Sequence, residues 1–246
     1  MKKLPILLIL PIFSTLLSAQ PHVYEDLLVY YVDEEYEKCV KKGERYVNSK
    51  ATRNDPLPYL YLSKCYHEMS KLERFNTDPD YKKADREALK YAVKFRKKDK
   101  ENEHFSAHED YWRELNSYAM ESGMNWYEQE KYPKARMIFS RMVSYDPSNP
   151  GAWQMLALCQ ARSRMMRDAQ ESMQHALEAY EQVKAEDEDL RTLTEDQKKL
   201  FKISLIEHSD LLAGNGLQDS ARVVLELGYE HFQDDPEYNM LYNELN

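Results

Sequence analysis

The chain has 246 residues, of which 42% are hydrophobic and 31% are charged, and its formal net charge is −9. This composition excludes a disordered chain and disfavours an integral membrane protein. The acidic balance argues against a general electrostatic attraction to nucleic acid or to anionic lipid. Only 6 glycines and 10 prolines are present, a scarcity that disfavours turn-dense β-sandwiches and favours long helices.

The first residues have the pattern of a secretory signal peptide. Residues 1–3 give a short basic start, residues 4–17 form an apolar run, and residues 17–19 (Leu-Ser-Ala) offer the small side chains that a signal peptidase reads. The apolar run contains two prolines and is shorter than the ~20 residues that a membrane-spanning helix needs. We therefore expect residues 1–19 to be cleaved and the mature chain to be periplasmic or secreted, with no direct membrane anchor. The first cysteine is Cys39, so the attachment cysteine of a bacterial lipoprotein is missing.

Amphipathic helices are expected in pairs along residues 20–246, because no stretch shows sustained period-2 alternation. The predicted pairs cover residues 20–51, 56–100, 116–149, 150–183 and 202–236, and a closing helix covers residues 237–246. Segments near residues 72–81 and 184–200 interrupt the regular spacing. We predict a single domain made of these pairs.

Local signals predict several helix starts. Asp33 is expected to cap the second helix, and Ser106-x2-Glu109 has the spacing of a capping box that opens a long helix. Thr194-x2-Gln197 is a second capping box. At Asn149-Pro150 and Asp235-Pro236 a capping residue precedes proline, which suits the first helical position.

An internal repeat joins the central segments. A shift of 34 residues places Gly123 on Ala157 and Ala135 on Ala169. A second spacing, of 12 residues, also recurs. It separates Gly123 from Ala135, Ala157 from Ala169, Ser209 from Ala221 and Leu27 from Cys39. Small residues at such positions let two antiparallel helices approach closely, while large neighbours fill the space beside them.

These residues resemble the tetratricopeptide repeat family over the central pair of units. Residues 116–149 keep Gly123, Trp126, Tyr132, Ala135, Phe139 and Pro147, and residues 150–183 keep Trp153, Leu156, Ala157, Ala169 and Ala176. In the second unit, Gln160 stands where an aromatic residue is usual. The resemblance implies an all-α, right-handed solenoid of about five antiparallel helical hairpins with a closing helix, of the exported bacterial-envelope type.

The resemblance also implies which residues contact a partner. Ligand-contacting positions of the family, carried onto this chain, include Met120, Met124, Tyr127, Glu128, Gln154, Leu158 and Arg162, with Lys64, His67 and Glu68 similarly placed in the second pair. Some members clamp an acidic C-terminus with polar donors, but Met120 and Met124 occupy those places here. We therefore expect an apolar, adaptable groove suited to an amphipathic helix or an extended apolar peptide. Two interpretations of the methionines stay open, a recognition surface or a core covered by a neighbouring hairpin.

Residues with reactive side chains form no catalytic pattern. HExxH, CxxC, P-loop, GxGxxG and GxSxG motifs do not occur, and Ser106 separates His104 from His108, so these two histidines need not share a helix face. We expect no metal and no cofactor. Three scattered cysteines do not make a disulfide framework, although a Cys39–Cys65 bridge stays open.

The sequence thus predicts a non-enzymatic scaffold that binds a partner protein or peptide. By the resemblance, it serves in a bacterial envelope complex for secretion or outer-membrane assembly. The alternative is a module that binds a glycan or another non-protein ligand, since 19 tyrosines offer ring faces on which sugars stack.

Overall fold

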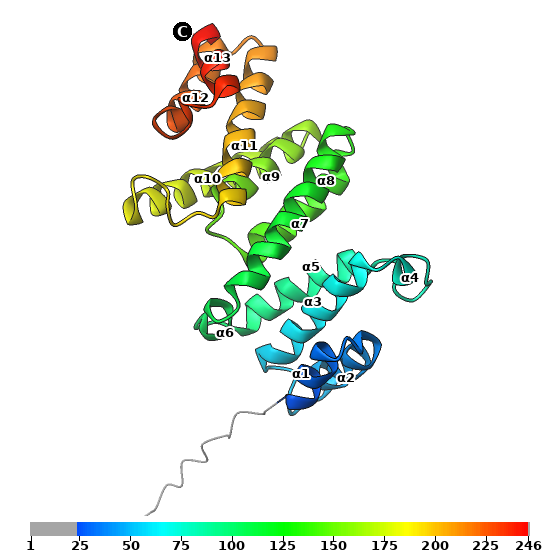
Figure 1. Ribbon diagram of the computed structural model, residues 1–246. Helices are drawn as coiled ribbons and strands as arrows, with labels where there is room; N and C mark the ends of the chain where they lie inside the picture. Colours follow the sequence, from blue (N-terminus) through cyan, green and yellow to red (C-terminus); the bar gives the residue numbers. More distant parts are fainter. Residues whose placement is uncertain (1–23, 246) are drawn as a thin grey trace, which may run out of the picture.

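The computed structural model describes residues 24–245, and these residues form thirteen helices and no β-strand (Figure 1). The all-α class expected from the composition is confirmed. The predicted signal peptide, residues 1–19, lies outside the described residues. No helix among residues 24–245 has the length and apolar character needed to cross a bilayer.

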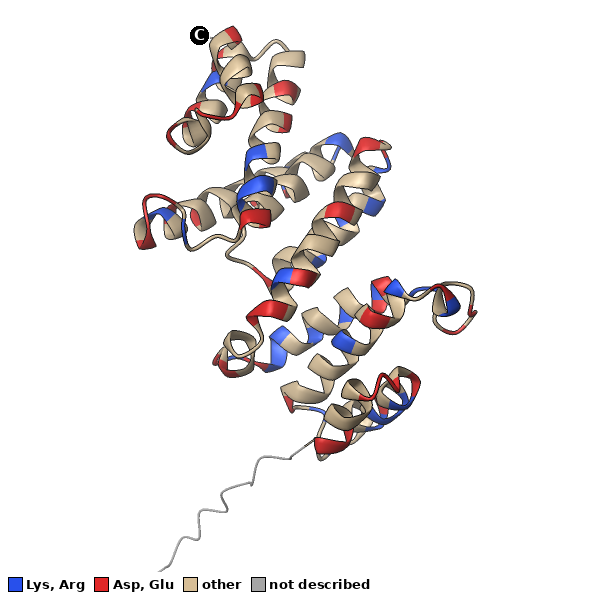
Figure 2. Cartoon of the chain, in the orientation of Figure 1, with Lys and Arg blue, Asp and Glu red and all other residues tan. Residues whose placement is uncertain are grey.

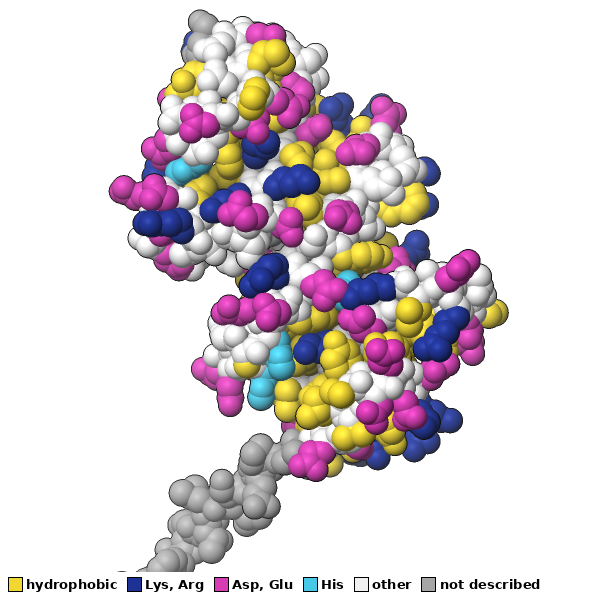
Figure 3. Space-filling view, viewed as in Figure 1, with side chains coloured by type: hydrophobic (Ala, Val, Ile, Leu, Met, Phe, Trp, Pro, Cys, Tyr) yellow, Lys and Arg dark blue, Asp and Glu magenta, His cyan; other side chains and the backbone are white. Residues whose placement is uncertain are grey.

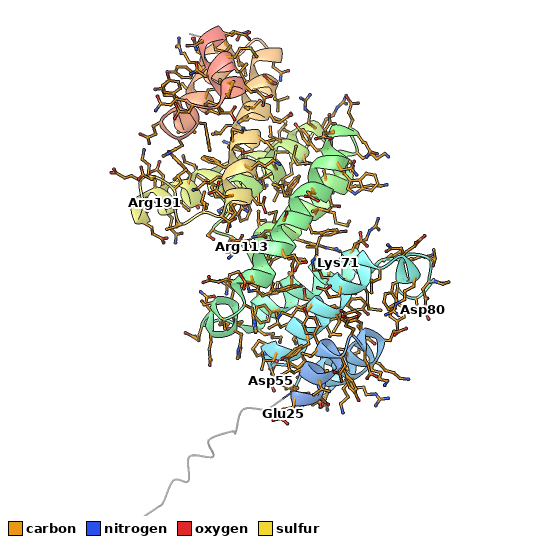
Figure 4. All side chains as sticks on the ribbon, in the orientation of Figure 1. Glu25, Asp55, Lys71, Asp80, Arg113 and Arg191 are labelled. Atoms are coloured by element: carbon orange, nitrogen blue, oxygen red, sulfur yellow. The ribbon has the colours of Figure 1, made fainter. Side chains whose placement is uncertain are left out.

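The helices follow one another along the molecule from α1 to α13 (Figure 1). They are α1 (Glu25–Val32), α2 (Tyr36–Asn48), α3 (Pro56–Lys71), α4 (Glu73–Asn76), α5 (Ala84–Lys98), α6 (Glu103–Ser106), α7 (Glu109–Glu128), α8 (Tyr132–Tyr145), α9 (Pro150–Arg162), α10 (Met166–Glu186), α11 (Glu195–Gly214), α12 (Gln218–Phe232) and α13 (Pro236–Leu245). Helix α1 packs on α2, α3 on α5, α7 on α8, α9 on α10, and α11 on α12, while α13 packs on α12. The short α4 occupies the first predicted interruption. At the second predicted interruption, α10 continues to Glu186, residues 187–194 connect it to α11, and α11 begins at Glu195. Arg191, labelled in Figure 4, lies in that connection and pairs with Asp187 (3.0 Å).

The 12-residue spacing marks the places where paired helices touch. A Cβ atom added to Gly123 on α7 would lie 2.7 Å from the Phe139 ring of α8, so only glycine lets these helices approach so closely. In the last pair, the Ser209 hydroxyl of α11 donates a hydrogen bond to the Ala221 carbonyl of α12 (3.2 Å). Small side chains at these positions therefore set the distance between the paired helices.

Four of the helix pairs are joined by the same tight turn. One residue in each turn has a positive φ: Glu34 (58°), Glu130 (57°), Arg164 (62°) and Gly216 (79°). The next residue donates its backbone N–H to the carbonyl five positions earlier, from Glu35 to Tyr30, Lys131 to Trp126, Met165 to Gln160 and Leu217 to Leu212. This is the hydrogen bond of a Schellman C-cap. The repeat therefore extends to the backbone of the turns, where the sequence offers no common residue type.

Three predicted helix caps are confirmed. The Asn149 side chain accepts the N–H of Ala152 (3.0 Å), and the Asp235 carboxylate accepts the N–H of Tyr238 (3.1 Å). Thr194 and Gln197 bond reciprocally at the start of α11, as a capping box does.

Two other predicted caps are wrong. Ser106 does not cap α7, because it is the last residue of α6 and its hydroxyl donates to the Asn102 carbonyl (3.0 Å). The Asp99 carboxylate caps the short helix α6 by accepting a hydrogen bond from the backbone N–H of Phe105 (2.7 Å). Asp33 ends α1 rather than starting α2, because the chain first turns through Glu34.

Buried apolar residues form two clusters. The N-terminal core extends from Tyr24 to Cys159 and also contains Leu200. The C-terminal core consists of Tyr180, Val183, Leu190, Leu193, Phe201, Leu205, Val224, Leu225 and Tyr238. Helix α11 contributes to both clusters, since Leu200 and Phe201 are consecutive residues. The three cysteines are buried and free, so Cys39 and Cys65 are not bridged in this structure.

Candidate functional site

Helix α11 lies across the surface that the sequence predicted to be the binding groove. It packs on α9 and also contacts α7. Of the predicted groove residues, Met120, Tyr127, Gln154 and Leu158 are buried, Met124 is half-buried, and only Glu128 and Arg162 are exposed. Four of these seven residues are therefore covered, and Met120 belongs to the buried core, the second of the two interpretations left open for the methionines. Partner binding over α7 and α9 stays a prediction.

Tyr127 illustrates how α11 closes this surface. Its hydroxyl is buried, with the Glu207 carboxylate of α11 and the Arg162 guanidinium of α9 as its charged neighbours. Burial raises the pKa of Tyr127, and the Glu207 carboxylate of α11 adds to the rise, whereas the Arg162 guanidinium opposes it. The ring of Tyr127 thus packs between helices and is not presented to a partner.

Two contacts hold α11 against the preceding helices. A Cβ atom added to Gly151 on α9 would lie 2.5 Å from the backbone nitrogen of Phe201, so the backbones of α9 and α11 touch. The Asp146 carboxylate, at the end of α8, accepts hydrogen bonds from Gln197 of α11 (2.9 Å) and Asn116 of α7 (2.7 Å). Burial raises the pKa of Asp146, while these hydrogen bonds act in the opposite direction.

Because α11 packs on α9, an apolar groove remains between α10 on one side and α11 and α12 on the other. Two adjoining cavities of about 290 and 720 Å³ share Gln170, Met173 and His208. We call this feature the α10–α12 groove. Its lining consists of Gln154, Ala157, Leu158, Ala161, Met166, Ala169, Gln170, Met173, Gln174, Ala176, Leu177, Tyr180, Phe201, Leu205, His208, Leu211, Leu212, Asn215, Leu217, Val224 and Leu227.

Large apolar side chains along this groove are open to solvent. Leu177 is 42% exposed, Leu217 51% and Met166 66%. On the face shown in Figure 3, hydrophobic side chains reach the surface in the part of the molecule that holds α9 to α12. Contiguous exposed apolar surface of this kind marks interaction sites more often than scattered single residues do.

The floor of the groove is polar but uncharged. The Gln154 Nε2 lies 3.1 Å from the His208 Nδ1, and the Gln154 Oε1 accepts from the Ser204 hydroxyl (2.9 Å). Burial lowers the pKa of His208 to about 4, so the imidazole is neutral at pH 7. Two of the predicted partner-binding residues, Gln154 and Leu158, thus lie on α9 at the floor of this groove, although little of either side chain is exposed.

Charged residues gather at one end of the groove. A further cavity of about 390 Å³ shares Tyr180 and Leu227 with the groove and is also lined by Glu181, Lys184, Val223, Glu226, Tyr229 and Glu230. Lys184 pairs with Glu230 (2.6 Å), and the Tyr180 hydroxyl donates to the Leu227 carbonyl (2.9 Å). Helices α10 and α12 are therefore joined at this end.

Lys64, His67 and Glu68, the residues of the second helix pair that the sequence analysis named, lie in a charged cluster between α3 and α7. Lys71, labelled in Figure 4, pairs with Glu114 and with Glu68 (2.9 Å to the latter). His67 is buried, and its Nε2 lies 3.3 Å from the Glu114 carboxylate. Burial lowers the pKa of His67. Lys64 lies over two tyrosine rings, and burial lowers its pKa as well.

Charges elsewhere are mixed, and Figure 2 shows Lys and Arg interspersed with Asp and Glu along the helices. His104 lies in α6 and His108 precedes α7, so the two histidines are on different elements. Within residues 24–245, no three His, Cys, Asp or Glu side chains converge as metal ligands.

Sequence reasoning missed the α10–α12 groove because Met173 and its neighbours occupy helix-packing positions of the repeat. A signal was nevertheless present, namely the interruption at residues 184–200 that lets the last pair depart from the regular spacing.

Comparison of the chain with protein-family models, with curated proteins and with solved structures gives no match.

Proposed function

We propose that this chain is a non-catalytic scaffold of stacked helical hairpins, of the tetratricopeptide type, that holds a helical segment of a partner protein in the α10–α12 groove. The shared turn geometry of four helix pairs supports a repeated hairpin architecture. The pattern of residues 1–19 supports export to the periplasm or beyond. The resemblance to envelope scaffolds favours a role in a secretion or outer-membrane assembly complex.

The observation that carries the proposal is the row of large apolar side chains left open between α10 and α12. The lining of α10 runs from Met166 to Tyr180 and continues to Lys184 at the charged end. At 1.5 Å per residue, these 18 steps give a groove about 27 Å long. That length matches a partner helix of about five turns, and the flexible side chains of Met166 and Met173 suit an irregular apolar surface.

A helix fits this groove better than an extended peptide does. An extended chain would press its backbone N–H and C=O groups against apolar walls, where they would lose hydrogen bonds to water. A helix satisfies these groups internally and presents an apolar stripe to the walls. A glycan receives less support, because Tyr180 is the only tyrosine among the described residues that line the groove, and its ring is buried.

The proposal is tested by site-specific photocrosslinking in the cells that make the protein. A photoreactive residue at Leu177 or Leu227 should capture one and the same partner, whereas the same group at Val29, an exposed apolar residue of α1, should not. The purified partner should then bind the purified scaffold, and Leu177→Glu should weaken binding at least tenfold while Val29→Glu leaves it unchanged.

Three results would contradict the proposal. Equal capture from Val29 would show that the contact is unspecific, and unchanged affinity of Leu177→Glu would show that the groove is not used. Capture of a second copy of this chain would identify the groove as a self-association surface instead. Circular dichroism of both glutamate variants verifies that the helix content is preserved.

A further inference from the structure

The groove has its charges at one end only. No Asp, Glu, Lys or Arg is among the described residues that line the two apolar cavities, whereas the adjoining cavity is lined by Glu181, Lys184, Glu226 and Glu230. The charged end lies at the C-terminal part of α10 and the middle of α12. A bound helix would therefore have an uncharged environment along most of its length and ionised groups at one terminus.

Two carboxylates at this end lack a cationic partner within residues 24–245. Lys184 is engaged by Glu230, with 2.6 Å between the ammonium and the carboxylate. Glu226 accepts a hydrogen bond from the Tyr242 hydroxyl (2.6 Å), which leaves its negative charge in place. Among the ion pairs of the described chain, none involves Glu181 or Glu226. Both side chains are exposed.

We infer that the partner helix carries Lys or Arg at the end that lies against Glu181 and Glu226, while the rest of its groove-facing stripe is uncharged and apolar. This inference rests on the proposed function. An acidic end would bring like charges together at the rim, which disfavours binding and thus excludes such partners. The scaffold as a whole has a net charge of −9, so its general field also favours a basic segment.

The expected effect is moderate, because both carboxylates are exposed. An exposed ion pair typically contributes up to about fivefold in an equilibrium constant, and salt screens it. Two pairs therefore predict that a helix with a basic end binds about 3- to 20-fold more tightly than one with a neutral end at low ionic strength. The preference should decline toward none in molar salt.

The test uses three synthetic helices of about 18 residues, the length of the groove, with the same apolar stripe and with Lys-Lys, Gln-Gln or Glu-Glu at one end. Their affinities are measured by fluorescence anisotropy for the wild-type chain, for Glu181→Lys/Glu226→Lys and for Leu177→Glu. Glu171→Lys/Glu188→Lys is the control matched in net charge, since both of these glutamates are exposed and lie outside the groove lining.

The expected order on the wild type and the control variant is Lys-Lys, then Gln-Gln, then Glu-Glu, and the order should invert on Glu181→Lys/Glu226→Lys. If all three helices bind equally and Leu177→Glu still abolishes binding, the charge inference is overturned and the proposed function stands. If no helix binds in a Leu177-dependent manner, the proposed function itself is overturned.

Discussion

The close approach of α9 and α11 gives the sharpest test of the architecture, through the substitution Gly151→Ala. The added methyl group would lie 2.5 Å from the backbone nitrogen of Phe201 and 2.8 Å from both the Leu200 carbonyl carbon and the Phe201 Cα. These are backbone atoms of α11, which cannot rotate away as a side chain can. Helix α11 would have to move as a unit, away from the helix that supports it.

The expected loss of stability follows from two opposing effects. Overpacking of a well-packed site costs about 1–3 kcal/mol, and contact with a rigid backbone puts Gly151→Ala at the upper end of this range. Alanine gains at most about 1 kcal/mol over glycine from its higher helix propensity. We therefore expect a net loss of about 2 kcal/mol in the free energy of unfolding, which for a chain of this size lowers Tm by roughly 4–8 °C.

Thermal unfolding and hydrogen exchange read out this effect. The variant should unfold at lower temperature, and amide exchange should accelerate along α11 before it does so along α3. Gly214→Ala is the control, because a Cβ added at Gly214 would have no heavy atom of the described residues within 4 Å; it should leave Tm unchanged or slightly raised. Wild-type Tm and exchange for Gly151→Ala would refute the contact between α9 and α11.

Three further predictions concern the turns, the buried carboxylate and the cysteines. Glu130→Gly should stabilise the chain by about 0.5–1 kcal/mol, because glycine adopts positive φ without strain, whereas Gly216→Ala should destabilise it in denaturant titration; effects of the same sign would contradict the shared turn. Asp146→Asn should be tolerated, since its amide oxygen is able to accept from Asn116 and Gln197 as Oδ2 does, and the Ser148 hydroxyl, which donates to Oδ1, is able to accept from the new amide instead. Burial raises the pKa of Asp146, so the contribution of this carboxyl to the wild-type free energy of unfolding falls as pH rises above its unfolded pKa of about 4. The variant lacks this contribution, so the stability difference should shift in its favour as pH rises from about 4, and a constant difference would argue against burial of the charge. Finally, Ellman titration should find no reactive thiol in the native chain and three in denaturant, while one thiol would indicate a Cys39–Cys65 bridge.

Much of the fold was predictable because it depends on short-range chemistry. Asn149 and Thr194 cap helices through atoms within three residues, and the sequence pattern reveals such contacts directly. The Gly123–Phe139 contact spans one hairpin and follows from the spacing of small and large residues. The exceptions, Asp33 and Ser106, depend on a positive φ at Glu34 and on a competing carboxylate, neither of which the pattern encodes.

The candidate site was not predictable, because it depends on contacts between distant segments. Gly151 meets Phe201 across 50 positions of sequence, and Asp146 bonds Gln197 across 51. The expected positions Gln154 and Leu158 lie on α9, on which α11 packs, and His208 of α11 lies 3.1 Å from Gln154. The apolar walls of the groove on α10 and α12 consist of residues that look like ordinary packing positions in the sequence.

The division of the interior into two apolar clusters, joined through α11, bears on how occupancy of the groove could be detected. The groove walls include Tyr180, Leu205 and Val224 of the C-terminal core, so a bound partner would protect chiefly the last third of the chain against local opening. At a free concentration of about one hundred times Kd, such protection amounts to about 2.7 kcal/mol, or roughly a hundredfold fewer opening events. Protease cleavage after α10 would then slow by a similar factor while cleavage near α1 would not, and limited proteolysis would report the loaded state without any label on either protein.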